Sequence, residues 1–104
     1  MESDVDVDSW LNSGDRFDYL GFPVFYRKAG KKSSVLLCLH GFPTSSFDYR
    51  KVWNDLSARF TLLAPDLIGY GFSAKPVDLN YTTFAQADLI AELLEHLGVS
   101  RVHI

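Results

Sequence analysis

The strongest structural signal in the sequence is VLLCLHGFP, at residues 35–43. Residues 35–40 form a continuous apolar run that ends in His40, and polar and apolar side chains do not alternate along it. This pattern is typical of a strand that is buried on both faces of a parallel sheet. The Gly-Phe-Pro sequence that follows would lie at the carboxyl end of this strand, where open parallel sheets bind their ligands.

Helices and strands alternate after this stretch. Apolar residues recur at helical spacing in residues 47–57, which predicts a helix, and residues 61–65 form a second apolar run that predicts another buried strand. A glycine-rich loop at residues 68–73 follows. Pro76 then disfavours the start of a helix directly after this loop.

The clearest predicted element is a helix in the last quarter of the sequence. Thr83 and Gln86 fit a capping box at its start, and Gly98 is placed to end it in the left-handed conformation. Its predicted buried face consists of Ala87, Ile90, Ala91, Leu94 and Leu97. Residues 102–104 then begin a further apolar strand.

Two aromatic-rich segments on the N-terminal side, residues 17–20 and 22–27, predict a pair of strands around Gly21. Because Pro23 cannot donate a ladder hydrogen bond, we expect this pair at a sheet edge. Residues 1–16 are rich in acids and are expected to form a solvated N-terminal tail, from which Trp10 and Leu11 can dock on the domain. An acidic interaction arm is the alternative interpretation of this tail.

The resulting order is strand, strand, strand, helix, strand, helix, strand. Buried strands that alternate with helices are joined by right-handed crossovers in a mainly parallel sheet. The sequence therefore predicts an α/β fold, in which the N-terminal strand pair precedes a βαβαβ parallel sheet. A single domain over residues 17–104 accounts for all of these elements.

The composition argues against several classes of protein. The chain has 104 residues and a net charge of −3, which speaks against nucleic acid and anionic membranes as partners. The single cysteine, Cys38, rules out an internal disulfide, and the three histidines have no metal-ligand spacing, so no metal site is expected. The longest apolar run is far too short to span a bilayer. The acidic N-terminus lacks the positive charge of a signal peptide, which favours a cytoplasmic location.

The residues His40-Gly41-Phe42-Pro43 can support chemistry at the carboxyl end of the first buried strand. Gly41 permits close approach of the backbone, and Pro43 fixes the chain while donating no N–H. The N–H of Phe42 is then free to point into a crevice, as the donor of an oxyanion hole must. The alternative is a strand-ending turn with a packing histidine.

Other motifs carry weaker signals. Residues 69–74 match the dinucleotide pattern G-x-G-x-x-A, but Pro76 separates them from the next helix, whose N–H groups would have to face a pyrophosphate. Asp66 is a candidate acid or base, although anchoring the glycine loop through backbone N–H groups is the simpler role. Cys38 is flanked by leucines, which favours an inert thiol. The sequence contains no G-x-S-x-G nucleophile elbow.

Three segments together, residues 40–46, 64–73 and 102–104, resemble the N-terminal part of the α/β-hydrolase fold. The resemblance covers roughly residues 17–104. It is closest to the epoxide hydrolases, the haloalkane dehalogenases and the mesoderm-specific-transcript-like hydrolases. These are cofactor-free enzymes that act on small molecules.

The resemblance implies roles for individual residues. Phe42 would supply one backbone N–H to the oxyanion hole, His40 and Gly41 would shape the turn, and Pro43 would follow a cis peptide. The structural loop after the second buried strand would be formed by Asp66, Gly69, Gly71 and Ser73. One subgroup of dehalogenases carries an Asn halide ligand where this chain has Phe42, which favours an epoxide-hydrolase-like or other branch.

The resemblance also implies which parts these residues do not supply. In the family, the nucleophile follows the strand that residues 102–104 begin, and the acid and the catalytic histidine come later still. We therefore expect the 104-residue chain to be inactive alone. The alternative is a non-catalytic binding or assembly fragment that pairs through its exposed sheet edge.

Overall fold

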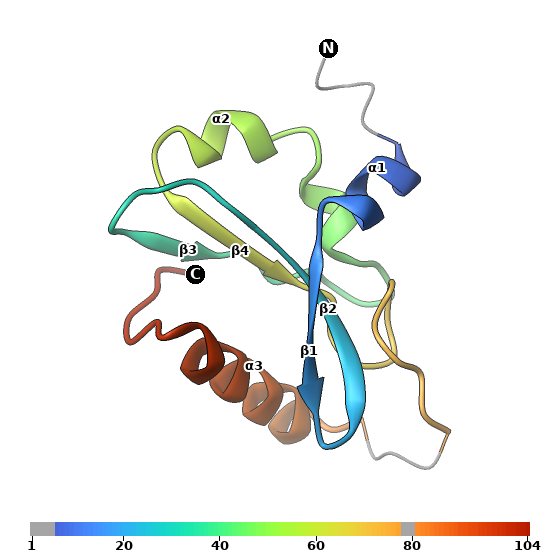
Figure 1. The fold of residues 1–104 in the computed structure, drawn as a ribbon. Helices are drawn as coiled ribbons and strands as arrows, with labels where there is room; N and C mark the ends of the chain where they lie inside the picture. The colour runs from blue at the N-terminus through green and yellow to red at the C-terminus, as the bar shows by residue number, and fades with distance from the viewer. Residues whose placement is uncertain (1–5, 78–80) are drawn as a thin grey trace.

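The computed structural model describes residues 6–77 and 81–104. A four-stranded sheet with the order β1-β2-β4-β3 lies between two layers of helices (Figure 1). The longest helix, α3, covers one face of the sheet, and the short helices α1, η2 and α2 cover the other. The strands are β1 (Asp15–Tyr19), β2 (Phe22–Ala29), β3 (Val35–Leu37) and β4 (Thr61–Pro65). The helices are α1 (Val7–Asn12), η2 (Ser46–Tyr49), α2 (Trp53–Ser57) and α3 (Thr83–Leu97).

The sheet is mixed. Strands β1 and β2 form an antiparallel hairpin at one edge, as predicted, and the turn places Leu20 and Gly21 at φ values of 52° and 87°. Strand β2 also pairs antiparallel with β4, whereas β3 pairs parallel with β4. Pro23 lies opposite Asp18 and outside the stretch of β2 that pairs with β4, so its missing N–H interrupts no ladder there.

Two predicted elements are shorter in the structure than the sequence indicated. Strand β3 ends at Leu37 rather than at His40, although the Cys38 N–H still donates to the Leu63 carbonyl. The helix predicted at residues 47–57 is divided into the 3₁₀ helix η2 and the single-turn helix α2. Between them the N–H groups of residues 50 and 52 donate to carbonyls three positions earlier, a tighter bonding pattern than that of an α-helix.

Helix α3 is confirmed, but its predicted cap and buried face are wrong in detail. The N-cap is Thr82, whose hydroxyl accepts the Ala85 N–H, so Thr83 and Gln86 do not form a capping box. The fully buried residues are Leu89 and Leu93, and Ile90, Leu94 and Leu97 are partly buried. Ala87 and Ala91, which were expected on the buried face, are exposed. Gly98 ends the helix at a φ of 71°, as predicted.

The segment after α3 reaches the sheet at a single position. The His103 N–H donates to Val35 O at 2.8 Å and the Leu37 N–H donates to His103 O at 2.7 Å, which forms a parallel bridge between Leu36 and His103. The predicted strand at residues 102–104 is therefore one bridge in length. It lies at the outer edge of β3, at the opposite side of the sheet from β1.

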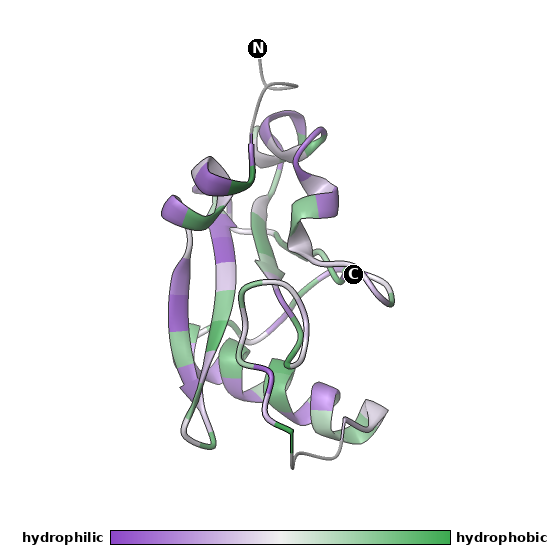
Figure 2. Cartoon of the chain, turned by 90° about the vertical axis from the view of Figure 1, so that its right-hand side faces the viewer, coloured by the Kyte–Doolittle hydropathy of each residue, from purple (hydrophilic) through white to green (hydrophobic). Residues whose placement is uncertain are grey.

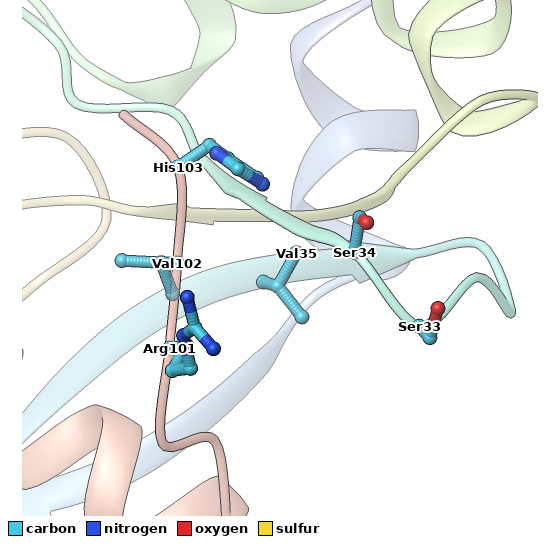
Figure 3. A pocket seen from close by; sticks show the side chains of 6 residues that line it. All are labelled: Ser33, Ser34, Val35, Arg101, Val102 and His103. Carbon is cyan, nitrogen blue, oxygen red and sulfur yellow. The ribbon is translucent and has the colours of Figure 1, made fainter.

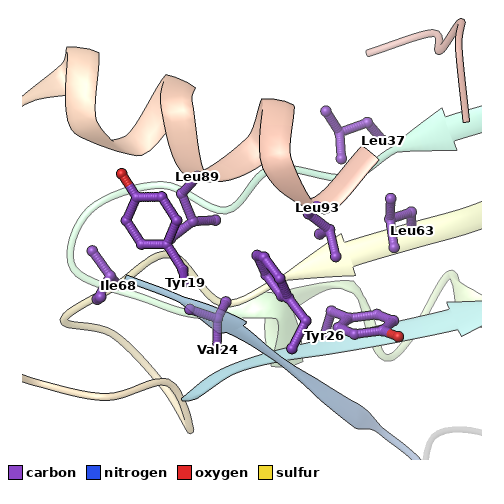
Figure 4. Packing of buried hydrophobic residues seen from close by; sticks show 9 residues of the cluster. Tyr19, Val24, Tyr26, Leu37, Leu63, Ile68, Leu89 and Leu93 are labelled. Carbon is purple, nitrogen blue, oxygen red and sulfur yellow. The ribbon is translucent and has the colours of Figure 1, made fainter. Parts of the chain in front are cut away.

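Side chains of β2 alternate between two hydrophobic clusters, one on each face of the sheet. Val24 and Tyr26 face α3, and Phe25 faces α1 and α2. Figure 4 shows the α3 side, where Leu89 and Leu93 project from the helix toward the side chains of the sheet. Figure 2 shows that α1 and α3 each combine hydrophilic and hydrophobic residues, as surface helices that cover a sheet do.

Helix α1 lies within the region that the sequence predicted as a solvated tail. Asp6 caps it by accepting the Ser9 N–H at 2.8 Å. Trp10 docks on the domain as expected, because it is fully buried and its indole N–H donates to Ser46 Oγ at 2.9 Å. One apolar pair is too short a pattern to indicate a helix, which is why the sequence did not predict α1. None of the helices in residues 6–77 and 81–104 is long and apolar enough to cross a membrane.

The fully buried carboxylate of Asp66 joins the end of β4 to two other segments. Its Oδ1 accepts the Ser46 N–H at 2.7 Å, and its Oδ2 accepts the Phe72 N–H at 2.8 Å. Gly71 has a φ of 53°, and a Cβ at this position would lie 2.2 Å from Asp66 Oδ2, so only glycine fits. The Ser73 hydroxyl donates to Asp66 O at 2.6 Å and accepts the Phe25 N–H at 2.9 Å. The structure confirms Asp66 as the anchor of the glycine loop.

The first prediction concerns this anchor. Substitution of Asp66 by Ala leaves two backbone N–H groups without an acceptor, and each buried unsatisfied donor costs about 1–3 kcal/mol. We therefore expect Asp66→Ala to lower the free energy of unfolding by about 2–6 kcal/mol. Denaturant titration measures this change. The matched control is Asp55→Ala on the exposed surface of α2, which should stay within about 0.5 kcal/mol of the parent. Equal effects of the two variants would refute the anchoring role.

The second prediction concerns the contact between β1 and α3. The buried Tyr19 hydroxyl donates to Asp88 Oδ2 at 2.9 Å. Burial, followed by the hydrogen bond to Asp88, raises the pKa of Tyr19 from 10.0 to about 12. Because the pKa is raised in the folded state, this stabilisation is complete below the ordinary pKa and is lost as the pH rises from 10.0 to about 12.

Comparison of Tyr19→Phe with the parent chain tests this assignment. The parent should lose stability between these two pH values more steeply than the variant, which has no hydroxyl to ionise. Thermal melts at a series of alkaline pH values measure the difference. Parallel loss of stability in both proteins would show that Tyr19 is not the group responsible.

Candidate functional site

The His40-Gly41-Phe42-Pro43 segment lies at the carboxyl end of the parallel strands β3 and β4. His40 is buried and holds this end together through both of its ring nitrogens. Its Nε2 accepts the Leu67 N–H at 3.0 Å, so the ring proton resides on Nδ1, which lies 2.8 Å from Gly41 O. His40 therefore links the end of β3 to the segment after β4 and occupies both nitrogens in doing so.

The carbonyl of Gly41 is the centre of a tight turn. Besides the His40 ring it accepts the Thr44 N–H and the Thr44 hydroxyl, each at 3.0 Å. The peptide bond between Phe42 and Pro43 is cis, in agreement with what the resemblance implied. No described atom lies within 4 Å of where a Cβ of Gly41 would be, so the space beside this glycine is open.

The backbone N–H of Phe42 takes no part in the hydrogen bonds of this turn. Within residues 6–77 and 81–104, no acceptor is bonded to the Phe42 N–H. The Phe42 side chain is 84% exposed and meets the Tyr70 ring edge to face, with the ring centroids 6.0 Å apart. The unbonded N–H is the feature that the oxyanion hypothesis requires of this residue, and the hypothesis places no demand on the ring.

A cavity of about 170 Å³ opens beside this segment. It is smaller than the roughly 300–1,000 Å³ typical of a complete small-molecule site. Three aromatic rings line it, those of Phe42, Tyr70 and Tyr81, and the N–H of the lining residue Leu67 is already bonded to His40. The lining residues are His40, Gly41, Phe42, Leu67, Tyr70, Tyr81, Thr83 and Gln86.

The sequence did not predict five of these residues as part of the site, namely Leu67, Tyr70, Tyr81, Thr83 and Gln86. Tyr81 and Gln86 come from the start of α3 and its approach, and Tyr70 comes from the glycine loop. Gln86, predicted as a capping residue, instead makes two hydrogen bonds to the backbone of Ile68, at 3.2 and 2.9 Å. The sequence does show that Gln86 is a polar residue on the side of the helix that faces the sheet. It does not show that Ile68 is its partner, because this depends on how α3 packs against the sheet.

The remaining candidate groups do not join this cavity. Burial raises the pKa of the Cys38 thiol, which favours its protonated, unreactive form. His96, in the last turn of α3, stacks on Phe17 with ring centroids 5.9 Å apart and does not line this cavity. In the described part of the chain, no cluster of three or more His, Cys, Asp or Glu side chains could hold a metal ion.

A larger cavity, of about 320 Å³, lies at the amino end of β3 (Figure 3). Its lining comes from the loop before β3 and the segment around the His103 bridge: Ser33, Ser34, Val35, Arg101, Val102 and His103. It shares no residue with the cavity at Phe42 and contains none of the predicted site residues. Size alone therefore does not identify the functional site in this chain.

Comparison with known proteins agrees with this geometry. The family described as alpha/beta hydrolase fold matches residues 34–104. The human mesoderm-specific transcript homolog protein is 44% identical over 101 residues, which cover 92% of this chain and 30% of that protein. The soluble epoxide hydrolase of Corynebacterium sp. (strain C12) is 37% identical over 84 residues, covering 81% of this chain and 29% of the enzyme.

A solved structure gives the same result in three dimensions. A loop variant of a haloalkane dehalogenase from Bradyrhizobium elkanii superimposes with a TM-score of 0.75 at 40% sequence identity, covering 83% of this chain and 29% of the enzyme. The chain thus spans about 30% of the length of these relatives. It belongs to the α/β-hydrolase fold family and corresponds to the N-terminal portion of that fold, related to mesoderm-specific transcript proteins, haloalkane dehalogenases and epoxide hydrolases.

Proposed function

We propose that residues 40–43 form part of the oxyanion hole of a cofactor-free hydrolase that acts on a small electrophilic molecule, an epoxide, an ester or a haloalkane. The observation that supports this proposal is the free Phe42 N–H, which lies beside a cavity at the carboxyl end of parallel strands. Members of the family carry names of enzymes for such substrates, among them a soluble epoxide hydrolase and a haloalkane dehalogenase. The same fold hosts unrelated functions, so the residues of the site, and not the fold, carry this proposal.

Each residue of the segment has a distinct proposed role. Phe42 donates its backbone N–H to oxygen that becomes negatively charged in the transition state. His40 and Gly41 hold the turn that presents this N–H, and Pro43 fixes the chain after it. Because the Phe42 side chain has no hydrogen-bond donor, it cannot hold a halide as an Asn at this place would. This favours an epoxide-hydrolase-like or ester-cleaving branch.

The proposed reaction also needs groups that attack and release the substrate. An Asp or Ser nucleophile would attack the electrophilic carbon, and a histidine-activated water would release the product. Neither Asp66 nor Ser73 fits the nucleophile role, because both are buried and hydrogen-bonded within the glycine loop. We propose that in the complete enzyme the nucleophile, the acid and the catalytic histidine come from residues outside these 104.

The third prediction tests the Phe42 N–H in the complete hydrolase. Phe42→Pro removes this donor and fixes φ at residue 42, and the preceding Gly41 tolerates a following proline better than other residues do. Loss of one oxyanion donor lowers kcat by about 10²–10³-fold. The matched control is Phe42→Ala, which keeps the N–H and loses only an exposed ring, so it should retain most of the kcat. Hydrolysis of p-nitrophenyl esters and epoxides measures both variants.

Two outcomes would contradict this proposal. Equal loss of kcat in Phe42→Ala and Phe42→Pro would show that the ring, not the N–H, matters. Turnover by the isolated 104-residue chain above the buffer rate would show that it contains its own nucleophile.

A second candidate function is that of an assembly fragment. Among residues 6–77 and 81–104, the outer edge of β3 pairs only through the Leu36–His103 bridge, and Ile104 beside it is 83% exposed. An unpaired strand edge with exposed apolar residues is a template for association with another chain. We propose self-association through this edge as the alternative to a catalytic role.

The fourth prediction distinguishes this alternative. The isolated chain should form dimers or larger species in sedimentation equilibrium, with a mass that rises with concentration. Val35→Pro removes a backbone N–H from β3, so that this strand can donate one hydrogen bond fewer to another chain. The substitution should therefore shift the distribution toward the monomer. A compact monomer with a sharp cooperative melt at all concentrations would contradict self-association.

A further inference from the structure

On the opposite face of the sheet from α3, a cavity of about 140 Å³ lies between α1, β2 and α2. Two arginines border it, Arg27 from β2 and Arg50 from the turn before α2. The other lining residues are two tryptophans and three uncharged polar residues: Trp10, Trp53, Ser9, Ser13 and Asn54. No aspartate or glutamate of the described residues lines it, so its walls carry positive charge only.

Arg27 occupies a position that the pleat of β2 directs into the core. Phe25, two residues earlier on the same face, is fully buried in the hydrophobic cluster that also contains Trp10 and Trp53. The Arg27 guanidinium lies over both indole rings, with its Cζ 4.3 Å from the Trp10 centroid and 5.0 Å from the Trp53 centroid. The two indoles meet edge to face with their ring centroids 5.0 Å apart, and both rings contact the Arg27 guanidinium.

The hydrogen-bonding capacity of this cluster is not satisfied within the described residues. The Arg27 Nε and the Trp53 Nε1 are buried and have no partner there, and Trp53 itself is only 5% exposed. Both atoms are donors and cannot accept. Burial lowers the pKa of Arg27, and no carboxylate in the described part of the chain acts in the opposite direction. Arg27 is partly buried, and its buried Nε has no acceptor among the described residues, so a bound anion would supply the acceptor that this atom lacks there.

Arg50 provides the second cation. Its guanidinium lies 4.3 Å from the Phe47 ring centroid and donates one hydrogen bond to Phe47 O at 3.1 Å. Guanidinium has five N–H donors in a planar fork, so one bond leaves most of its donors available. Aromatic stacking thus holds both arginines in place at the rim of the same cavity.

We propose that this cavity binds a phosphate group, as inorganic phosphate or as the phosphate of a small monoester. Two fixed guanidinium groups match a phosphate, which carries a charge of about −1.5 to −2 at neutral pH, better than a singly charged carboxylate. A water molecule occupies about 30 Å³ in the liquid, so the cavity has room for one tetrahedral anion but not for a nucleotide. The site shares no lining residue with the cavity at Phe42, and the proposal is independent of the hydrolase function.

The fifth prediction uses the tryptophans as reporters, because the only two in the chain both line this cavity. Titration of the full chain with inorganic phosphate at constant ionic strength should change the tryptophan fluorescence saturably. Arg27→Gln should weaken phosphate binding about tenfold or more, as expected for loss of hydrogen bonds to a charged group. Arg50→Gln should weaken it in the same direction and serves as the test if Arg27→Gln does not fold.

The matched control is Lys28→Gln, which removes one positive charge from the neighbouring, exposed position of β2. It should leave the affinity within about twofold, because exposed charges outside the cavity are screened. Acetate is the comparison anion and should bind more weakly than phosphate. The proposal is overturned by the absence of a saturable response to phosphate, by equal effects of Lys28→Gln and Arg27→Gln, or by acetate binding as tightly as phosphate.

Discussion

The buried Asp66 carboxylate holds the carboxyl end of the sheet together. A fully buried carboxylate is tolerated only where hydrogen bonds replace its hydration, and here two backbone N–H groups, from Ser46 and Phe72, do so. The next residue along the chain, Leu67, donates its N–H to His40. Asp66 and Leu67, two neighbouring residues directly after β4, thereby connect the segment after β3 to the loop after β4. The position of the Phe42 N–H follows from this arrangement rather than from the Phe42 side chain, which packs on little.

The sequence predicted best those elements whose pattern depends on burial alone. Strand β4 has five consecutive buried residues, and its predicted bounds of 61–65 match the structure. Helix α3 and its Gly98 cap were also predicted, because helix length and a left-handed terminal glycine are local signals. The Thr83–Gln86 capping box was wrong because the helix is capped one residue earlier, by Thr82, and the Gln86 side chain bonds to Ile68 across the fold. Local patterns compete poorly with tertiary hydrogen bonds of this kind.

The candidate site was predictable only in part for the same reason. The place of the His40-Gly41-Phe42-Pro43 segment follows from the rule that parallel strands end at one edge of the sheet. The opposite wall of the cavity cannot be derived in this way, because Tyr81 and Gln86 reach it through the docking of α3. Helix α1 escaped prediction as well. Its place depends on one tryptophan and on a hydrogen bond to Ser46, more than thirty residues away.

The two faces of the sheet are built on different principles, although one strand serves both. Toward α3, β2 presents Val24 and Tyr26 to an apolar cluster. Toward α1 and α2 it presents Phe25 and then Arg27, a cation at a position where an apolar side chain would avoid the cost of desolvation. Stacking on two indoles offsets only part of that cost. An arginine is therefore a poor choice for stability at this position, and it becomes a reasonable one if this face of the sheet accommodates an anion.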